Sequence, residues 1–179
     1  MAQDIEQWVK MARAGSRKAF DRLSKRYTPF IFRFLYDLTG NYEDARDLTQ
    51  DTFLKAYTGL GNFRGDSKFS TWLYKIAYHL GIDYKRSARH RSGVTVDETS
   101  EKFMKDTEPE PVDPDTRSAM EKGLKKLTPP QRTAVVLHYY HQCRMREIGE
   151  ILGCSESTVR VHLHRAMNHL RKELKDFAS

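Results

Sequence analysis

Residues 91–116 constrain the fold of this chain most, because they cannot lie in the core of a compact domain. They hold three Lys or Arg against eight Asp or Glu, contain three prolines, and have almost no periodic apolar pattern. A connection of this length without structure is unusual inside one domain and typical of a linker. The sequence therefore predicts two small domains, residues 1–90 and 117–179, joined by an acidic interdomain linker at residues 91–116. The linker is either a solvated tether or a segment that lies in a basic groove of a partner.

Both predicted domains are basic. Residues 1–90 contain 16 Lys or Arg and 10 Asp or Glu, residues 117–179 contain 12 and 6, and the chain of 179 residues has a formal net charge of +7. This surplus points to a polyanionic partner, although charge alone does not identify the partner.

The chain lacks the features of an exported or membrane-spanning protein. No apolar run approaches the roughly 20 residues that span a bilayer, and the first residues lack a basic region followed by an apolar stretch. Cys143 and Cys154 are too few for a disulfide framework and fit a reducing cytoplasm. We therefore expect neither a secreted nor an integral membrane protein.

The first domain is predicted to be helical throughout. Apolar residues recur every three or four positions within residues 5–14 and 18–38, with a break at Gly15-Ser16. Pro29 is predicted either to kink the second of these helices or to mark a junction between two helices.

The boundaries of the next two helices are predicted from capping and glycine-rich residues. Gly40 ends the preceding helix and Asn41 is a natural N-cap for a helix over residues 42–58. The glycine-rich residues 59–68 predict a loop, and a further helix over residues 69–86 follows it.

An acidic stripe runs along the predicted helix 42–58. Asp44, Asp47 and Asp51 occupy positions i, i+3 and i+7, which lie on one helix face. The stripe is either a solvated face or a docking surface for another protein, since it would repel nucleic acid.

Aromatic residues are concentrated in the first domain, which holds 16 of the 20 in the chain. Most of them are needed to fill a small helical core. Phe63, Tyr74 and Tyr78 lie close in sequence to Lys and Arg and to the predicted loop, which also suits stacking on unpaired bases.

The second domain is predicted to contain a helix-turn-helix. Thr128-Pro129-Pro130-Gln131 is a strong helix start, and a short helix over residues 145–152 is followed by a turn and a long helix capped by Ser155. These proportions are typical of DNA-binding helix-turn-helix motifs, although an ordinary helical hairpin can share them. The outward positions of the last helix are Ser157, Arg160, Val161 and His164, while Arg165, Arg171 and Lys172 suit phosphate contacts.

A series of short motifs occurs in a fixed order along the chain: DARDLTQDTFL at 44–54, FSTWLYKIA at 69–77, LTP at 127–129, EIG at 147–149, STVR at 157–160 and RA at 165–166. With them the chain resembles a bacterial RNA polymerase sigma factor of the sigma-70 family. Specifically, it resembles the small extracytoplasmic function (ECF) class, which keeps only the second and fourth sigma domains. The resemblance covers about residues 15–90 and 117–176. Many relatives have Arg-Asn where this chain has Tyr78-His79, so a preference for minus-ten bases is not carried over.

The resemblance implies an all-α protein with a sigma-2-like bundle at 1–90 and a sigma-4-like helix-turn-helix at 117–179. It implies binding to core RNA polymerase, at the clamp helices of the largest subunit and the flap of the second-largest subunit, and to promoter DNA. The residues implied in polymerase binding are Asp44, Asp47, Leu48, Gln50, Asp51, Phe53 and Leu54. The linker would thread the polymerase toward its RNA exit path.

The resemblance also assigns two sets of DNA-binding residues. For the minus-ten element and for melting they are Asn62, Phe63, Arg64, Lys68, Ser70, Trp72, Tyr74, Lys75, Tyr78 and His79. For the minus-thirty-five element they are Ser157, Thr158, Arg160, Val161, His164 and Arg165. Relatives are held inactive by a cognate anti-sigma factor, so we expect a cytoplasmic protein that such a factor could hold at the inner face of the membrane.

Other functions fit the sequence less well. The chain is too short for a large catalytic scaffold, lacks a phosphate loop after a strand and offers no nucleophile-base pair, so we expect no enzyme and no cofactor. A metal site among His138, His141, Cys143, Cys154, His162 and His164, or a redox switch through the two cysteines, is a weaker alternative. A helix-turn-helix regulator would need an effector or phosphoacceptor domain that the first block does not resemble. An anti-sigma or adaptor protein that binds polymerase without reading a promoter also stays open.

Overall fold

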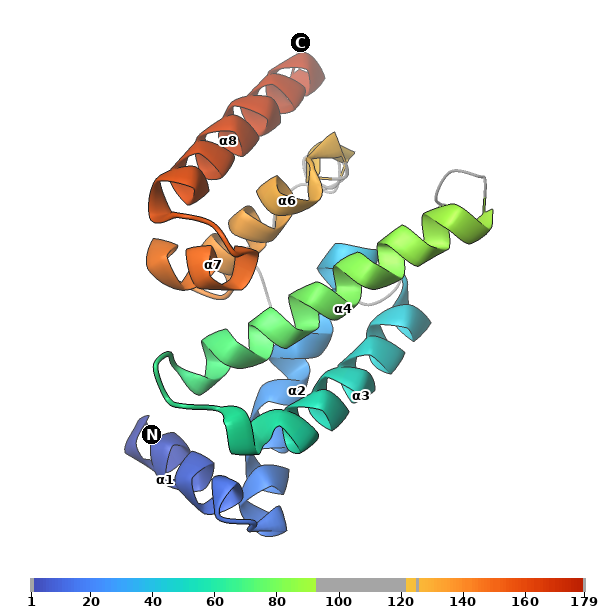
Figure 1. Cartoon of the computed structure of the whole chain (residues 1–179). Helices are drawn as coiled ribbons and strands as arrows, with labels where there is room; N and C mark the ends of the chain where they lie inside the picture. Colours follow the sequence, from blue (N-terminus) through green and yellow to red (C-terminus); the bar gives the residue numbers. More distant parts are fainter. Residues whose placement is uncertain (1, 93–121, 125, 179) are drawn as a thin grey trace. The chain divides into compact units, whose positions relative to one another are not determined.

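The computed structural model describes residues 2–92, 122–124 and 126–178 (Figure 1). In these residues every regular element is helical, which confirms the all-α prediction. The first unit contains α1 (Ala2–Arg13), α2 (Arg17–Thr39), α3 (Tyr42–Gly59), the 3-10 turn η1 (Leu60–Asn62) and α4 (Phe69–Ser92). The second contains α6 (Pro129–Val135), the π-helical turn η2 (Val136–Tyr140), α7 (Met145–Leu152) and α8 (Glu156–Ala178).

The chain divides into two compact units, each with its own core. Most of the predicted linker, residues 93–116, lies outside the described residues, so the acidic linker stays a prediction. Within the described part of the chain, no helix combines the length and the apolar character needed to cross a bilayer.

The predicted helix ends of the first unit are confirmed by their hydrogen bonds. Ser16 Oγ accepts the Ala19 N–H at 3.3 Å and starts α2, while Gly40 ends it with a left-handed φ of 75°. Asn41 Oδ1 then accepts the Asp44 N–H at 3.1 Å and starts α3. Side-chain acceptors at these positions satisfy N–H groups that a helix start leaves without a partner.

Pro29 does not divide α2, so the predicted helix junction is wrong. Pro29 is exposed, whereas Ile31, Phe34 and Leu35 in the adjoining turns are fully or almost fully buried. A proline removes one backbone hydrogen bond, but burial of a continuous apolar face supplies most of the stability of a helix in a protein. That buried face therefore maintains α2 through the proline.

Helices α2, α3 and α4 pack together around the core of the first unit. Gly81 allows α4 to approach α2 closely, because a Cβ at this position would overlap the Leu38 side chain. One turn later Lys85 Nζ donates to the Leu38 carbonyl at 2.9 Å. Since α2 has no basic residue in its own last turn, Lys85 supplies the positive charge that stabilises a helix C-terminus.

Two sequence-based boundaries need correction. The predicted loop at 59–68 begins with η1, because buried Leu60 and Phe63 anchor the chain to the core. Helix α4 was expected to end at Arg86 but continues to Ser92, since no Gly or Pro interrupts residues 87–92.

The second unit is a set of short helices around α8. The predicted helix start is present, with the Thr128 N–H donating to Gln131 Oε1 at 3.2 Å. The following helix reaches Tyr140 as predicted, although its last turn is π-helical. Leu137, Ile148, Ile151 and Val159 are fully buried and form the core of this unit.

The turn between α7 and α8 depends on two glycines. Gly153 ends α7 with a left-handed φ of 70°, and the Cys154 N–H donates to the Gly149 carbonyl at 2.9 Å. The turn passes so close to α7 that a Cβ at Gly149 would lie 2.7 Å from the Cys154 carbonyl oxygen. Backbone cannot move aside as the end of a side chain can.

We therefore expect Gly149→Ala to destabilise the second unit by about 1–3 kcal/mol, the usual cost of an overpacked site. Chemical denaturation followed by circular dichroism measures this change in the free energy of unfolding. Gly61→Ala is the matched control, because nothing lies within 4 Å of a Cβ there and its φ is not positive. Equal stabilities of the two variants would contradict the close approach at Gly149.

Candidate protein-docking and nucleic-acid surfaces

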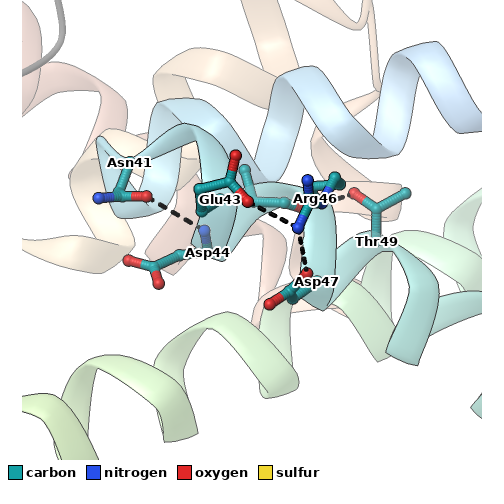
Figure 2. Close-up of polar contacts among 7 residues, drawn as sticks. Asn41, Glu43, Asp44, Arg46, Asp47 and Thr49 are labelled. Carbon is teal, nitrogen blue, oxygen red and sulfur yellow. Dashed lines mark hydrogen bonds and ion pairs between the residues drawn. The ribbon is translucent and has the colours of Figure 1, made fainter.

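The start of α3 carries a dense set of charges (Figure 2). Arg46 lies between two carboxylates, with its Nη2 atom 2.6 Å from Glu43 Oε2 and 3.5 Å from Asp47 Oδ1. Asp44 is half-buried, and its N–H is held by the Asn41 cap. Acidic side chains are favourable at the positive N-terminal end of a helix, which accounts for Glu43 and Asp44 without any partner.

Further along α3, the exposed residues form a mixed acidic and apolar face. We define the α3 surface as Asp47, Gln50, Asp51 and Leu54, which follow one another at i, i+3, i+4 and i+7. All four are exposed, and Leu54 is 64% exposed although it is a large apolar side chain. An exposed leucine among carboxylates suits a protein partner with apolar and basic groups, and the carboxylates would repel nucleic acid.

Two further residues implied in polymerase binding lie elsewhere on α3. Leu48 is only 7% exposed and belongs to the core, so its expected role in docking is corrected to packing. Phe53 is half-buried at the edge of the α3 surface. Sequence reasoning missed Tyr57, which is half exposed and continues the face three residues after Leu54. Its spacing of three residues after Leu54 on a predicted helix would have been enough to predict it.

Eight of the ten residues expected at the minus-ten element are exposed or half-buried. Exposed members are Asn62, Arg64, Lys68, Lys75 and His79, and half-buried members are Ser70, Trp72 and Tyr78. They come from η1, the loop after it and α4, so the fold brings them to neighbouring segments of the first unit. The exposed cations can meet phosphates, and Trp72 and Tyr78 retain partly open rings.

Phe63 and Tyr74 are core residues, which corrects the expectation that they stack on bases. Phe63 is 6% exposed and packs against Trp72 and Phe69, with ring centroids 5.1 and 6.0 Å away. Tyr74 is equally buried and meets the Phe34 ring edge-on at 5.4 Å. Both rings are covered by protein, so they hold the loop and α4 in place and offer no open face.

The start of α8 presents a polar outward face, as the helix-turn-helix prediction requires. Val161 is 45% exposed, and Arg160, His164 and Arg165 are exposed around it. Arginine can bond guanine edges or phosphates, and an exposed valine can contact a thymine methyl group.

Ser157 and Thr158 have a second role at the cap of α8. The Thr158 N–H donates to Ser155 Oγ at 3.2 Å, and the hydroxyls of Thr158 and Ser157 lie 2.8 and 2.7 Å from the same oxygen. Arg160 Nη2 lies 2.6 Å from Glu156 Oε1, and His164 Nε2 lies 2.9 Å from Asn168 Nδ2. These contacts orient the outward face, and sequence reasoning had not singled out Glu156.

The structure offers little support for the two weaker alternatives, a metal site among His and Cys residues and a redox switch through the two cysteines. Both thiols are free, and burial raises the pKa of the Cys154 thiol, which reduces its reactive thiolate form. Among the described residues, no group of three His, Cys, Asp or Glu side chains could hold a metal ion.

Two family models match the chain. The model described as Sigma-70 region 2 matches residues 23–91, and the model described as Sigma-70, region 4 matches residues 117–170. The ECF RNA polymerase sigma factor SigW of Bacillus subtilis is 31% identical over 98% of this chain and 100% of its own length. The RNA polymerase sigma factor YlaC of the same organism is 34% identical over 88% of this chain and 93% of its own length.

Solved structures share the fold. The sigma factor RpoE from Bartonella quintana, in complex with the anti-sigma factor NepR, has a TM-score of 0.75 and 23% identity over 88% of this chain and 98% of that chain. CnrH, in complex with the cytosolic domain of CnrY, has a TM-score of 0.73 and 23% identity over 98% of this chain and 99% of that chain.

Leu48 and Leu54 allow packing and docking to be separated on one helix. We expect Leu48→Ala to lower the free energy of unfolding by about 2–5 kcal/mol, the usual cost of truncating a core leucine. Leu54→Ala should change it by less than about 0.5 kcal/mol, because this side chain is mostly exposed. Denaturant titration of both variants checks this. A large loss of stability in Leu54→Ala would mean that Leu54 is a packing residue and not part of a docking surface.

Proposed function

Because this chain belongs to the sigma-70 family of RNA polymerase sigma factors, and to its ECF class, we propose that its two units divide the tasks of promoter recognition. The chain is a sigma factor, which binds core polymerase and directs promoter-specific transcription initiation. Sigma factors are initiation factors, and we infer that this one has no catalytic residue of its own. The proposed division is residues 1–90 for core docking, minus-ten recognition and melting, 117–179 for minus-thirty-five recognition, and 91–116 as the linker.

The α3 surface is the observation that carries this assignment of sites. A helix-turn-helix regulator needs a basic DNA-reading helix, but it has no use for an exposed leucine among carboxylates on another unit. A sigma factor needs both surfaces, since it must bind a protein and DNA together. We assign Asp47, Gln50, Asp51 and Leu54 to the clamp helices of the largest polymerase subunit.

The remaining surfaces take the DNA contacts. The exposed loop and α4 residues, with Trp72 and Tyr78, would capture unpaired minus-ten bases, whose unstacking costs a few kcal/mol each. Arg160, Val161, His164 and Arg165 would read the minus-thirty-five element. Each contact alone is weak and sensitive to salt, and joining two of them on one polymerase raises the effective concentration of the second.

We also infer control by an anti-sigma factor, because the sigma factor RpoE, which shares this fold, was solved in complex with the anti-sigma factor NepR. The protein would then act in the cytoplasm, either free or held by that partner at the inner face of the membrane. Co-purification of the tagged chain from its native cells tests this, with the Leu54→Ala variant showing whether the partner covers the α3 surface.

The function as a whole is tested by transcription in vitro. Sigma-free core polymerase is incubated with fragments of the source genome, with and without the protein, and the start sites are mapped. Discrete start sites that need the protein support the sigma function and define both promoter elements. Absence of start sites, combined with sequence-specific binding of the protein alone to duplex DNA, would favour the regulator alternative.

For the docking role, we expect Asp51→Arg to weaken binding to core polymerase at least about tenfold, because it reverses a charge within the interface. A fluorescence titration of labelled protein with core polymerase measures the affinity. Asp21→Arg on α2 is the matched control, since it makes the same charge change at an exposed site outside α3. Unchanged core binding of Asp51→Arg would remove this residue from the docking surface.

For the DNA-reading role, we expect Arg160→Ala to cost about 1–3 kcal/mol in recognition of the minus-thirty-five element and to relax its sequence preference. Core binding should stay as in the wild type. Arg171→Ala, further along the same helix, should weaken binding equally to matched and mismatched elements, as a phosphate contact does. Heparin-challenged promoter binding by the holoenzyme measures both effects, and loss of core binding by Arg160→Ala would contradict the assignment.

A further inference from the structure

A row of exposed residues on α2 has no part in the surfaces described so far. Lys18, Arg22, Arg26 and Phe30 follow one another at intervals of four, so they form one ridge along the helix. All four are exposed, and Phe30 is 40% exposed although it is a large aromatic residue. We call this row the α2 ridge. At a rise of about 1.5 Å per residue, successive members are about 6 Å apart along the helix axis.

The three cations of the α2 ridge lack ion-pair partners among the described residues. Some other exposed cations of the described part do have carboxylates beside them, such as Arg46 with Glu43 and Arg86 with Asp83. Like charges four residues apart destabilise a helix by about 0.2–0.5 kcal/mol per pair. The ridge contains two such pairs, Lys18 with Arg22 and Arg22 with Arg26, and exposed Asp21 between Lys18 and Arg22 offsets part of this repulsion. A polyanion beside the ridge would relieve the rest.

Two of the ridge cations also lie against aromatic rings. The Arg26 guanidinium lies 5.6 Å from the centre of the Phe30 ring, and that of Arg22 lies 5.7 Å from the Trp8 ring. Cations next to a partly exposed aromatic ring are a combination that binds single-stranded nucleic acid, because the cations follow the backbone while the ring stacks on a base.

The Phe30 end of the α2 ridge lies near the minus-ten surface, by which we mean the loop and α4 residues proposed to hold minus-ten bases. Tyr27 on α2 contacts Phe69, the first residue of α4, with ring centroids 5.5 Å apart. Phe30 lies three residues after Tyr27 and is therefore its neighbour on the helix surface. A strand held by the loop before Phe69 can thus continue past Phe30 onto Arg26, Arg22 and Lys18.

We propose that the α2 ridge is a further binding site for single-stranded DNA, in which Phe30 stacks on a base and Lys18, Arg22 and Arg26 contact successive phosphates. The inference extends the proposed function, because the strand is the one that the minus-ten surface would hold. Its occupant is an unpaired strand and not a duplex, since a base must be free to stack on Phe30.

The test uses the full-length protein and a fluorescein-labelled oligothymidylate of about 20 nucleotides, with binding followed by anisotropy at several salt concentrations. Lys18→Gln with Arg26→Gln should reduce the slope of log affinity against log salt by about 1.4, since each phosphate contact on a single strand contributes about 0.7. Arg22 is left in place because it packs on Trp8. The matched control is Lys10→Gln with Lys55→Gln, two exposed cations of the same unit off the ridge.

A second variant separates stacking from charge. Phe30→Leu keeps an apolar side chain and should lower the affinity for the oligothymidylate about fivefold or more, with the salt slope unchanged. Circular dichroism establishes that each variant is folded. A salt slope that the ridge variant does not change, or that the control changes equally, would overturn the proposal.

If the proposal fails, two further probes show which other kind of ligand the ridge binds. An equal loss of affinity for a duplex of the same length would make the ridge a general polyanion surface. Loss of binding to labelled polyglutamate, with oligothymidylate binding intact, would make it a protein-docking surface. Arg64→Gln, measured in the same assay, tests the loop by itself, so failure of the minus-ten assignment is distinguished from failure of the ridge.

Discussion

Burial of the apolar face of α2 supports every surface of the first unit. Leu23, Ile31, Phe34 and Leu35 are almost completely removed from water, and α3 and α4 pack against them. Each well-buried side chain of this kind stabilises the fold by about 1.5–3 kcal/mol. Helix α1 also packs on α2, yet Lys18, Arg26 and Phe30 stay exposed on α2. Both α3 and α4 contact α2, so the exposed face of α3 and the loop before α4 depend on its position.

The charges of the first unit follow from the same packing. A helix that buries one face presents its other face to solvent, so neighbouring helices can carry surfaces of opposite sign. On α3 the outward face is acidic with one exposed leucine, and on α2 it is basic with one exposed phenylalanine. A protein that must bind a protein and a nucleic acid at once gains from this separation, because like charges repel the wrong partner.

The helix-turn-helix of the second unit depends on backbone geometry at its turn. The turn before α8 requires a left-handed residue at Gly153 and the absence of a side chain at Gly149. The Ser155 cap then fixes where α8 begins, and Arg160 and Val161 follow within two turns. The position of the outward face of α8 is therefore set by a few contacts in the turn before it.

Much of the architecture is readable from local sequence, because the signals act within a few residues. Gly40 and Asn41 end one helix and start the next through their own backbone and side-chain geometry, and Thr128 and Ser155 mark helix starts in the same way. Helical spacing likewise identified the acidic face of α3. The motif order identified the family, which the comparisons confirm.

Tertiary structure decided which side chains are open to a partner. Leu48 and Leu54 both belong to the same motif, yet one is in the core and the other is exposed, because α2 and α4 cover only one side of α3. The sequence predicts that Phe63 and Tyr74 could stack on bases, but in the structure their rings pack against Trp72 and Phe34 and are buried. Helix period and capping are local properties that the sequence determines by itself. Exposure depends on which distant helix lies against each residue, and this is settled only when the helices pack.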